Sequence, residues 1–240
     1  RLHHRRGIPT VAVSFGVGGL HIGGFGIGVS HKELFQHGQP RHLPPQCRKF
    51  NSRALDTLAR ESDIKAMRCL MLLRHAKTER AEPGGRDRDR MLVKRGRNDA
   101  TVIGKYMSDH GLVPDLAIVS PAASAEETWT LVAAGFGKAP RMATDGRIYN
   151  AIPETLINLI GETRKAPALL VVGHNPGLHE LALQLIISGN PKMREQINEK
   201  LPTSGLVVID LPLDDWSTLH PHAGRLERFV SPRLIAAATE

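Results

Sequence analysis

Two histidines, each placed directly after an apolar run, are the residues of this sequence best suited to chemistry. His75 follows Arg74 at the end of the run 67–73, and His174 follows the run 168–173. A neutral imidazole is a nucleophile, and a guanidinium offers forked donors that match phosphoryl oxygens. The charge of Arg74 also disfavours imidazolium, so it promotes the neutral form of His75. The pair therefore suits phosphoryl transfer through a phosphohistidine, with no metal or cofactor required.

Alternating strands and helices must position these histidines. The sequence predicts strands over 67–73, 115–120, 141–145, 168–173, 205–211 and 225–231, and helices over 92–110, 122–134, 153–164 and from 177 to about 188. Near-continuous apolar strands that alternate with helices favour an α/β fold with a largely parallel sheet covered on both faces. Ligands bind such sheets beyond the carboxyl ends of the strands. If the two histidine-bearing strands are parallel neighbours, both imidazoles project into one crevice.

The second histidine has two interpretations. His174 could donate to the equatorial oxygens of a transferring phosphoryl group and so stabilise the transition state. Alternatively, His75, His174 and His179 could bind zinc. However, His174 and His179 are five residues apart across Pro176 and Gly177, so they do not share a helical face, and no acidic third ligand stands out. The pattern therefore favours a phosphate pocket over a metal site.

Composition excludes several classes of protein. The 240 residues are 41% hydrophobic and 23% charged, values of a globular chain rather than a coiled coil, a collagen or a fully disordered protein. Two cysteines exclude a disulfide scaffold and fit a reducing compartment, so we expect a cytoplasmic protein. Aromatic residues make up only 4%, which argues against a base-stacking surface. We expect no nucleic-acid or membrane partner, and the sequence leaves the oligomeric state open.

The first 66 residues differ from the rest. They hold ten Lys and Arg against four Asp and Glu, whereas residues 67–240 hold 22 against 20, so most of the net charge of +8 lies in this segment. The stretch 7–30 is rich in glycine, which makes ordering its backbone costly. A signal peptide or membrane anchor is one interpretation. We expect instead a disordered or non-native extension upstream of a start at Met67, followed by a catalytic domain over 67–240.

Five motifs resemble the histidine phosphatase superfamily, which has the phosphoglycerate-mutase-like fold. They are LRHAKTE (73–79), DRMLVKRGRNDA (89–100), VSPAASAEET (119–128), YNAIPETL (149–156) and VVGHNPGLHELA (171–182), in family order and spacing. The DR-x-L-x-x-RG element and the short segments between motifs are most similar to the SixA-type phosphohistidine phosphatase branch. The resemblance covers about 67–240. It implies a three-layer α/β/α sandwich and a phosphatase that acts on a phosphorylated protein or a small phosphorylated molecule.

The resemblance also implies roles for individual residues. His75 would be the nucleophile, Arg74 would bind the phosphoryl group, and His174 would be the second histidine of the phosphate pocket. Arg90 would line the mouth of the pocket. Asn175 would fix the turn that positions His174.

One residue departs from the family pattern. Ser124 stands where the motif S-P-x-x-R-A-x-x-T carries an arginine. Loss of a charged partner in a buried phosphate site costs about 2–5 kcal/mol. Two outcomes stay open: an arginine of the loop 80–90 (Arg80, Arg86, Arg88 or Arg90) fills the gap, or the chain is a weak or inactive phosphate-binding or regulatory domain.

The general acid is a second open point. Superfamily members that cleave phosphate esters use a carboxylic acid to protonate the leaving group. Glu79 and Glu154 are the candidates in this sequence. Glu154 follows Pro153 and fits better as a first-turn residue of a helix, where it meets the helix dipole. Phosphohistidine needs less help, because its leaving group is a nitrogen base.

Overall fold

The structure is a computed structural model that describes residues 35–36, 39–40, 66–80 and 83–238. The chain divides into two units, 1–43 and 44–240. In the first unit, the described residues form the strands β1 (Phe35–Gln36) and β2 (Gln39–Pro40), which pair antiparallel. The predicted disordered extension over 1–66 falls almost wholly outside the described residues and stays a prediction.

A seven-stranded sheet forms the centre of the second unit, in the order β5-β4-β6-β3-β8-β9-β7. Its strands are β3 (Met67–Arg74), β4 (Leu116–Val119), β5 (Arg141–Thr144), β6 (Ala168–Gly173), β7 (Ile186–Gly189), β8 (Leu206–Pro212) and β9 (Gly224–Val230). Only β8 runs antiparallel to its neighbours in this sheet. The prediction of a largely parallel sheet, with 141–145 at its edge, is confirmed.

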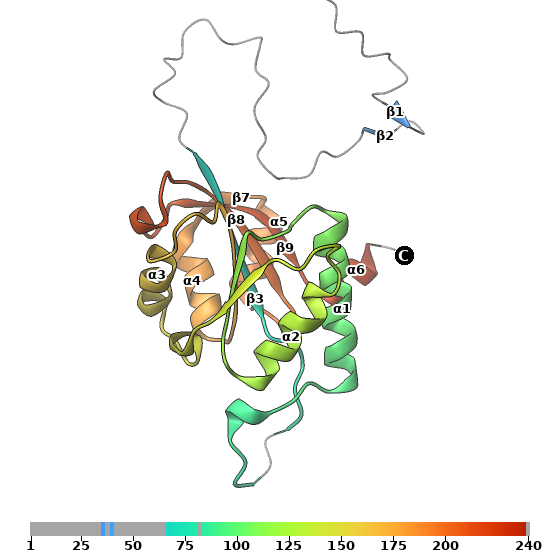
Figure 1. The fold of residues 1–240 in the computed structure, drawn as a ribbon. Helices are drawn as coiled ribbons and strands as arrows, with labels where there is room; N and C mark the ends of the chain where they lie inside the picture. The colour runs from blue at the N-terminus through green and yellow to red at the C-terminus, as the bar shows by residue number, and fades with distance from the viewer. Residues whose placement is uncertain (1–34, 37–38, 41–65, 81–82, 239–240) are drawn as a thin grey trace, which may run out of the picture. The chain divides into compact units, whose positions relative to one another are not determined.

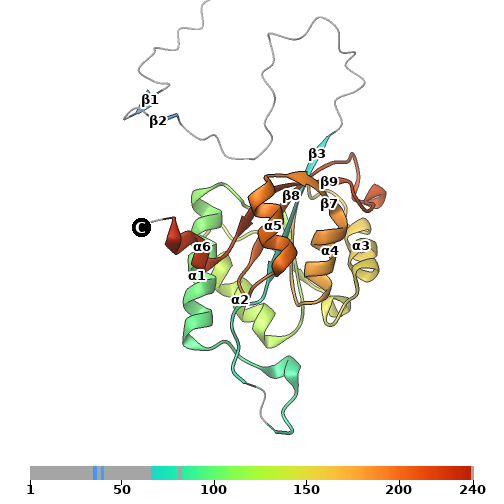
Figure 2. The ribbon, with the colours of Figure 1, turned by 180° about the vertical axis from the view of Figure 1, so that it is seen from behind.

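Helices cover both faces of this sheet (Figure 1, and from behind in Figure 2). The helices α1 (Lys94–Asp109) and α2 (Ala123–Ala133) pack on one face, and α3 (Pro153–Gly161), α4 (Gly177–Leu185) and α5 (Pro191–Glu199) pack on the other. A short helix, α6 (Pro232–Ala237), contacts α1. In the described part of the chain, the connections contain the 3₁₀ turns η2 (Asp87–Asp89), η3 (Gly146–Ile148) and η4 (Trp216–Thr218).

Alternation along the central strands creates two separate apolar cores. In β3, Leu70 and Leu72 face the core under α3 and α4, whereas Met71 and Leu73 face the core under α1 and α2. All four side chains are essentially inaccessible to water. Successive strand residues point to opposite faces, so a strand that is apolar throughout must be covered on both sides. The fold is therefore the three-layer α/β/α sandwich that the motifs predicted.

Two predicted helix ends were wrong. The helix predicted over 153–164 ends at Gly161. The helix expected to run to about 188 ends at Leu185, and β7 begins at Ile186. The apolar residues there resemble the continuation of a helix, but they pair with β9. At the end of β7, Gly189 adopts a φ of 134°, and a Cβ on it would lie 2.6 Å from the carbonyl oxygen of Leu226. Tertiary pairing thus overrides the local pattern.

Helix α5 was not predicted, although its start has a sequence signal. Asn190 caps it by accepting hydrogen bonds from the amides of Lys192 and Met193, and Pro191 occupies the first turn. An Asn-Pro pair of this kind is typical of a helix start.

Candidate active site

The carboxyl ends of β3 and β6 bring the two histidines together. These strands pair in parallel with Arg74 opposite Gly173, so His75 and His174 come next at the same edge of the sheet. The amide of His75 donates to the carbonyl oxygen of Gly173 at 3.0 Å. The ring centroids of the two imidazoles lie 5.0 Å apart, with the ring planes inclined at 50°. The shared crevice expected from the sequence is therefore present.

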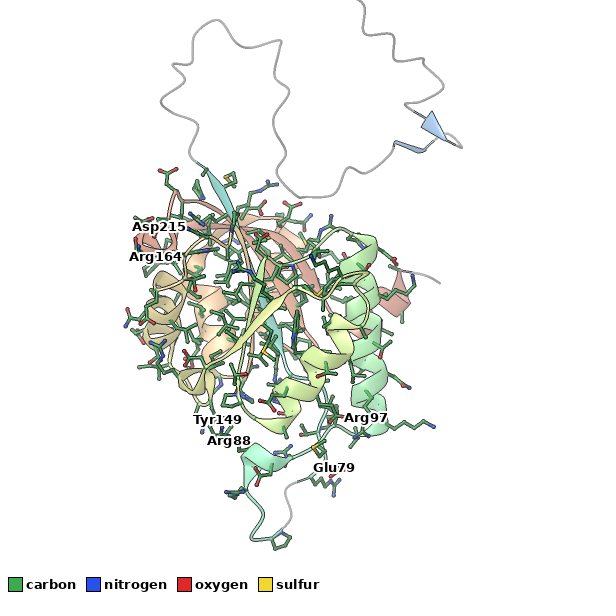
Figure 3. All side chains as sticks on the ribbon, in the orientation of Figure 1. Glu79, Arg88, Arg97, Tyr149, Arg164 and Asp215 are labelled. Carbon is green, nitrogen blue, oxygen red and sulfur yellow. The ribbon has the colours of Figure 1, made fainter. Side chains whose placement is uncertain are left out.

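The end of the sheet that holds these residues is visible in Figure 3. Glu79, Arg88 and Tyr149 lie near this end, and Arg164 and Asp215 lie at the opposite end. The loop after β3 extends from the first end and contains η2 (Figure 1). Residues from this loop therefore reach the strand ends that carry the histidines.

One hydrogen bond fixes the tautomer of His75. Its Nδ1 lies 2.8 Å from the carbonyl oxygen of Ala76, which can only accept, so Nδ1 carries the hydrogen. In the neutral ring the lone pair then lies on Nε2. Burial, chiefly, holds the pKa of His75 below its ordinary value, and the charge of Arg74 acts in the same direction. His75 is therefore a neutral imidazole with a free Nε2 at neutral pH.

Hydrogen bonds to α2 hold the segment that carries His75. The amide of Ala76 donates to Oγ1 of Thr128 at 2.9 Å, and this hydroxyl in turn donates to the carbonyl oxygen of Ser124 at 2.6 Å. Thr128 is fully buried. A buried threonine thus ties the strand end of β3 to the first turn of α2.

His174 is held by Ser120, which follows β4. Its Nε2 lies 2.8 Å from Oγ of Ser120, which leaves Nδ1 as the ring nitrogen available to a ligand. The ring also meets the edge of Tyr149 at a centroid distance of 5.2 Å. Burial and the nearby His75 lower the pKa of His174 to about 4. Both histidines are therefore neutral at pH 7 when no anion is bound.

Arg74 supplies the positive charge beside these rings. Its Nη1 donates to the carbonyl oxygen of Leu201 at 3.0 Å, and its Nε is buried without a hydrogen-bond partner. Asn175 donates from Nδ2 to the same carbonyl oxygen at 2.9 Å. A buried donor without a partner is costly unless a ligand satisfies it, so Arg74 is suited to an anion. Asn175 positions the turn after His174 and does not line the cavity.

These side chains line a cavity of about 150 Å³. Its floor, as we name it, consists of Arg74, His75 and His174 at the strand ends. Its rim consists of Lys77, Asp87 and Arg90 from the loop after β3. Thr78, Ser124 and Thr203 complete the lining.

Arg90 is fully engaged by its own loop. Its Nε donates to the carbonyl oxygen of Glu79 at 3.0 Å, its Nη1 pairs with Asp87, and its Nη2 donates to Oγ1 of Thr78. Tyr149 donates its hydroxyl to the other oxygen of Asp87 at 3.2 Å. The hydrogen bond from Arg90, above all, lowers the pKa of Asp87. This carboxylate is therefore ionised at neutral pH.

The other predicted residues differ in whether they line the cavity. Ser124 lies in the cavity wall and is only 4% exposed, and its hydroxyl makes no hydrogen bond to another described residue. Glu79 is exposed and is absent from the cavity lining. Glu154 lies exposed in the first turn of α3, as expected from its place after Pro153.

The zinc interpretation gains no support from the position of His179. Its Nε2 donates to the carbonyl oxygen of Ile197 in α5 at 2.6 Å, so it points toward that helix rather than the cavity. Among the described residues, no three His, Cys, Asp or Glu side chains gather as a ligand set.

Within the described part of the chain, no helix has the length and apolar character needed to cross a membrane.

Sequence reasoning missed five residues of this site, of which Thr78 and Thr203 are threonines of the cavity lining. Lys77 and Asp87 line the cavity, and Tyr149 contacts both His174 and Asp87. Lys77 lies two positions after His75, where its spacing from the nucleophile was the available signal. Asp87 lies in an alternating run of Arg and Asp whose pairing no local pattern reveals.

A neutral histidine beside a partly buried arginine, with a second histidine across a small cavity, forms a site that suits a phosphoryl group, on a three-layer α/β fold. Comparison with known proteins then identifies the family. The chain is similar to a crystal structure from Agrobacterium tumefaciens named as a candidate phosphohistidine phosphatase SixA, with 30% identity and a TM-score of 0.59 over 69% of this chain and 98% of that one. The chain belongs to the histidine phosphatase superfamily.

Two sequence relatives have no described activity. An uncharacterized protein of Mycobacterium tuberculosis is 36% identical over 167 residues, which are 67% of this chain and all of the relative. An uncharacterized protein of Arabidopsis thaliana, named as chloroplastic, is 30% identical over 207 residues, which are 80% of this chain and 91% of the relative. No protein-family model matches the chain.

Proposed function

We propose that this protein is a phosphatase that transfers a phosphoryl group first to Nε2 of His75 and then to water. The observation that carries this proposal is the hydrogen bond from Nδ1 of His75 to the carbonyl oxygen of Ala76, which leaves Nε2 with its lone pair in a cavity that also holds Arg74 and His174. A neutral, oriented imidazole is the form that attacks phosphorus.

The floor suits the transition state of this transfer. As the bond from phosphorus to the leaving atom breaks and the bond to Nε2 forms, negative charge spreads over the three equatorial oxygens. Arg74 offers guanidinium donors to these oxygens. His174 offers Nδ1, which carries a hydrogen and can donate in the tautomer where Nε2 accepts a hydrogen bond from the hydroxyl of Ser120. In the second step, water attacks the phosphohistidine, inorganic phosphate leaves, and Nε2 regains its lone pair.

The rim supports phosphohistidine as the substrate. An alkoxide leaving group needs a proton from a carboxylic acid, but Asp87, the one carboxylate among the described residues that line the cavity, is ionised through Arg90. When the P–N bond of phosphohistidine breaks, the leaving group is an imidazole that can already carry its proton, so no such acid is needed. The SixA name of the Agrobacterium structure points to the same substrate. We therefore propose phosphohistidine in a protein, or a small molecule with an equally good leaving group.

A leaving-group series tests this proposal. The full chain is incubated with a phosphohistidine peptide, an aryl phosphate and an alkyl phosphate, beside the variant His75→Ala. We expect kcat/KM to fall in that order, and the variant to be inactive on all three. Equal rates on the aryl and alkyl phosphates would show that a general acid operates, and would overturn the choice of substrate.

Ser124 favours a second candidate function, a phosphate-binding or regulatory domain with little or no turnover. A neutral hydroxyl in the cavity wall supplies less stabilisation than a cation would. Binding of inorganic phosphate without turnover of any of the three substrates would favour this candidate over the phosphatase.

A further inference from the structure

The charges around the cavity do not balance a bound phosphate without Lys77. A phosphoryl group in its dianionic form brings two negative charges. Arg74 supplies one positive charge, whereas the charge of Arg90 is already paired with Asp87. Ser124 contributes a neutral hydroxyl. One further cation is therefore needed, and Lys77 is the remaining cation among the described residues of the cavity lining.

The side chain of Lys77 is available to bind an anion. It is exposed, it lines the cavity, and its ammonium makes no ion pair or hydrogen bond with another described residue. An ammonium group has three donors and no acceptor, so a phosphoryl oxygen is a suitable partner.

The backbone at Lys77, by contrast, is firmly held. Its carbonyl oxygen accepts a hydrogen bond from the amide of Val93 at 3.0 Å, and the next residue, Thr78, forms a β-bridge with Leu92. Helix α1 approaches so closely that a Cβ on Gly96 would lie 2.1 Å from this oxygen. The Cα atom of Lys77 is therefore held in place beside the cavity.

Lys77 and Ser124 belong to neighbouring walls of the cavity. The hydroxyl of Thr128 bridges the amide of Ala76, which directly precedes Lys77, and the carbonyl oxygen of Ser124. A cation introduced at position 124 would therefore act on the same small volume as the ammonium of Lys77.

We propose that Lys77 is a substrate-binding residue that contacts the phosphoryl oxygens and supplies the positive charge that Ser124 does not. This inference rests on the proposed function only in placing the phosphoryl group in this cavity. According to this proposal, the second positive charge at the cavity, beside that of Arg74, comes from the loop after β3 and not from the start of α2.

Binding of inorganic phosphate to the full chain, measured by calorimetry, tests Lys77 without requiring turnover. We expect Lys77→Met to weaken binding about 10- to 100-fold, the range for losing a charged hydrogen bond. Lys77→Arg should bind nearly as well as the wild type. Lys105→Met is the matched control, because Lys105 pairs with Asp109 on α1 and lies outside the cavity lining. Phosphate binding unchanged in Lys77→Met, with an unchanged unfolding transition, would overturn the proposal.

A second variant tests whether the two positions share one role. Ser124→Arg should strengthen phosphate binding more in the Lys77→Met background than in the wild type, because only there is a charge missing. Equal gains in the two backgrounds would contradict a shared role.

The two proposals fail in different ways. If the wild type binds phosphate through Lys77 but hydrolyses no substrate, the phosphatase proposal fails and the assignment of Lys77 stands. If Lys77→Met binds phosphate and hydrolyses an aryl phosphate as the wild type does, the assignment of Lys77 fails and the phosphatase proposal stands.

Discussion

The floor and the rim of the cavity hold their side chains in different ways. The floor residues continue two paired strands, so the register of β3 and β6 places His75 and His174 together, and backbone carbonyls orient His75 and Arg74. The rim residues lie in the loop after β3, where Arg90 pairs with Asp87 and the carbonyl oxygen of Lys77 accepts a hydrogen bond from the amide of Val93. In the proposed phosphatase, the floor would therefore perform the reaction and the rim would set the charge and the choice of leaving group.

Replacing the nucleophile should have the largest effect. His75→Ala should lower kcat/KM on an aryl phosphate by about 10,000-fold or more, as expected for loss of a group that acts in a covalent unit. His179→Ala is the matched control, since His179 bonds to α5 and lies outside the cavity lining, and it should remain active. If His75→Ala retained a tenth of the wild-type activity, His75 could not be the nucleophile of the reaction.

The next largest effect should come from the guanidinium of the floor. Arg74→Gln should weaken phosphate binding and lower kcat/KM by about 30- to several thousand-fold, because a buried charged partner is lost. Arg68→Gln is the control, since Arg68 lies on the same strand and stacks on Trp216 away from the cavity. Similar losses of activity in the two variants would contradict a specific role for Arg74.

The pH dependence should sharpen the comparison. Burial lowers the pKa of His75 below its usual 6.5 and that of His174 to about 4, so both rings are mainly neutral above pH 6.5. The nucleophile is lost only as the pH falls through the lowered pKa of His75, where kcat/KM should drop about tenfold per pH unit. Because the unfolded chain binds these protons more readily, the free energy of unfolding should also decrease below pH 6.5.

Histidine titration by NMR measures these values directly in the full chain, with the variants His75→Ala and His174→Ala to assign the signals. Midpoints below 6.5 are expected for both rings. A midpoint above 6.5 for His75 in the phosphate-free protein would contradict the neutral nucleophile.

Asp87→Asn, a substitution in the rim, should have the smallest effect. Asp87 is largely exposed and paired with Arg90, so the change in kcat/KM on an aryl phosphate should stay below about fivefold. Removal of a negative charge near the anion should lower KM. Loss of 100-fold or more, the range of a general acid, would show that the rim takes part in the reaction.

The floor could be predicted from the sequence because its information is local. Apolar runs that end in Arg74-His75 and in His174 specify buried strands, and parallel strands bring their carboxyl ends to one edge. The fold class follows from the same runs. The positions of Arg74, His75 and His174 at one edge of the sheet were therefore predicted, whereas Ser124 was expected in the pocket only from the family motif.

Most of the rim could not be predicted in the same way. Arg90 was expected at the mouth of the pocket from the family resemblance, and it does line the cavity. Loop residues take their positions from contacts distant in sequence, such as Tyr149 with Asp87 and Arg88 with the carbonyl oxygen of Pro121. Local patterns therefore suggested Glu79 as a site residue, but it is exposed outside the lining, and they missed Lys77 and Asp87. Strand β7 was missed for a similar reason, because its pairing with β9 is a tertiary contact.

Trapping the phosphoryl-enzyme tests the central claim most directly. The full chain is mixed with a phosphohistidine peptide in excess, quenched in alkali within one turnover, digested and analysed by mass spectrometry. We predict an acid-labile, alkali-stable phosphoryl group on the peptide that contains His75, and none in His75→Ala. Full turnover with no phosphoryl group on His75, or with the group on another residue, would contradict the account.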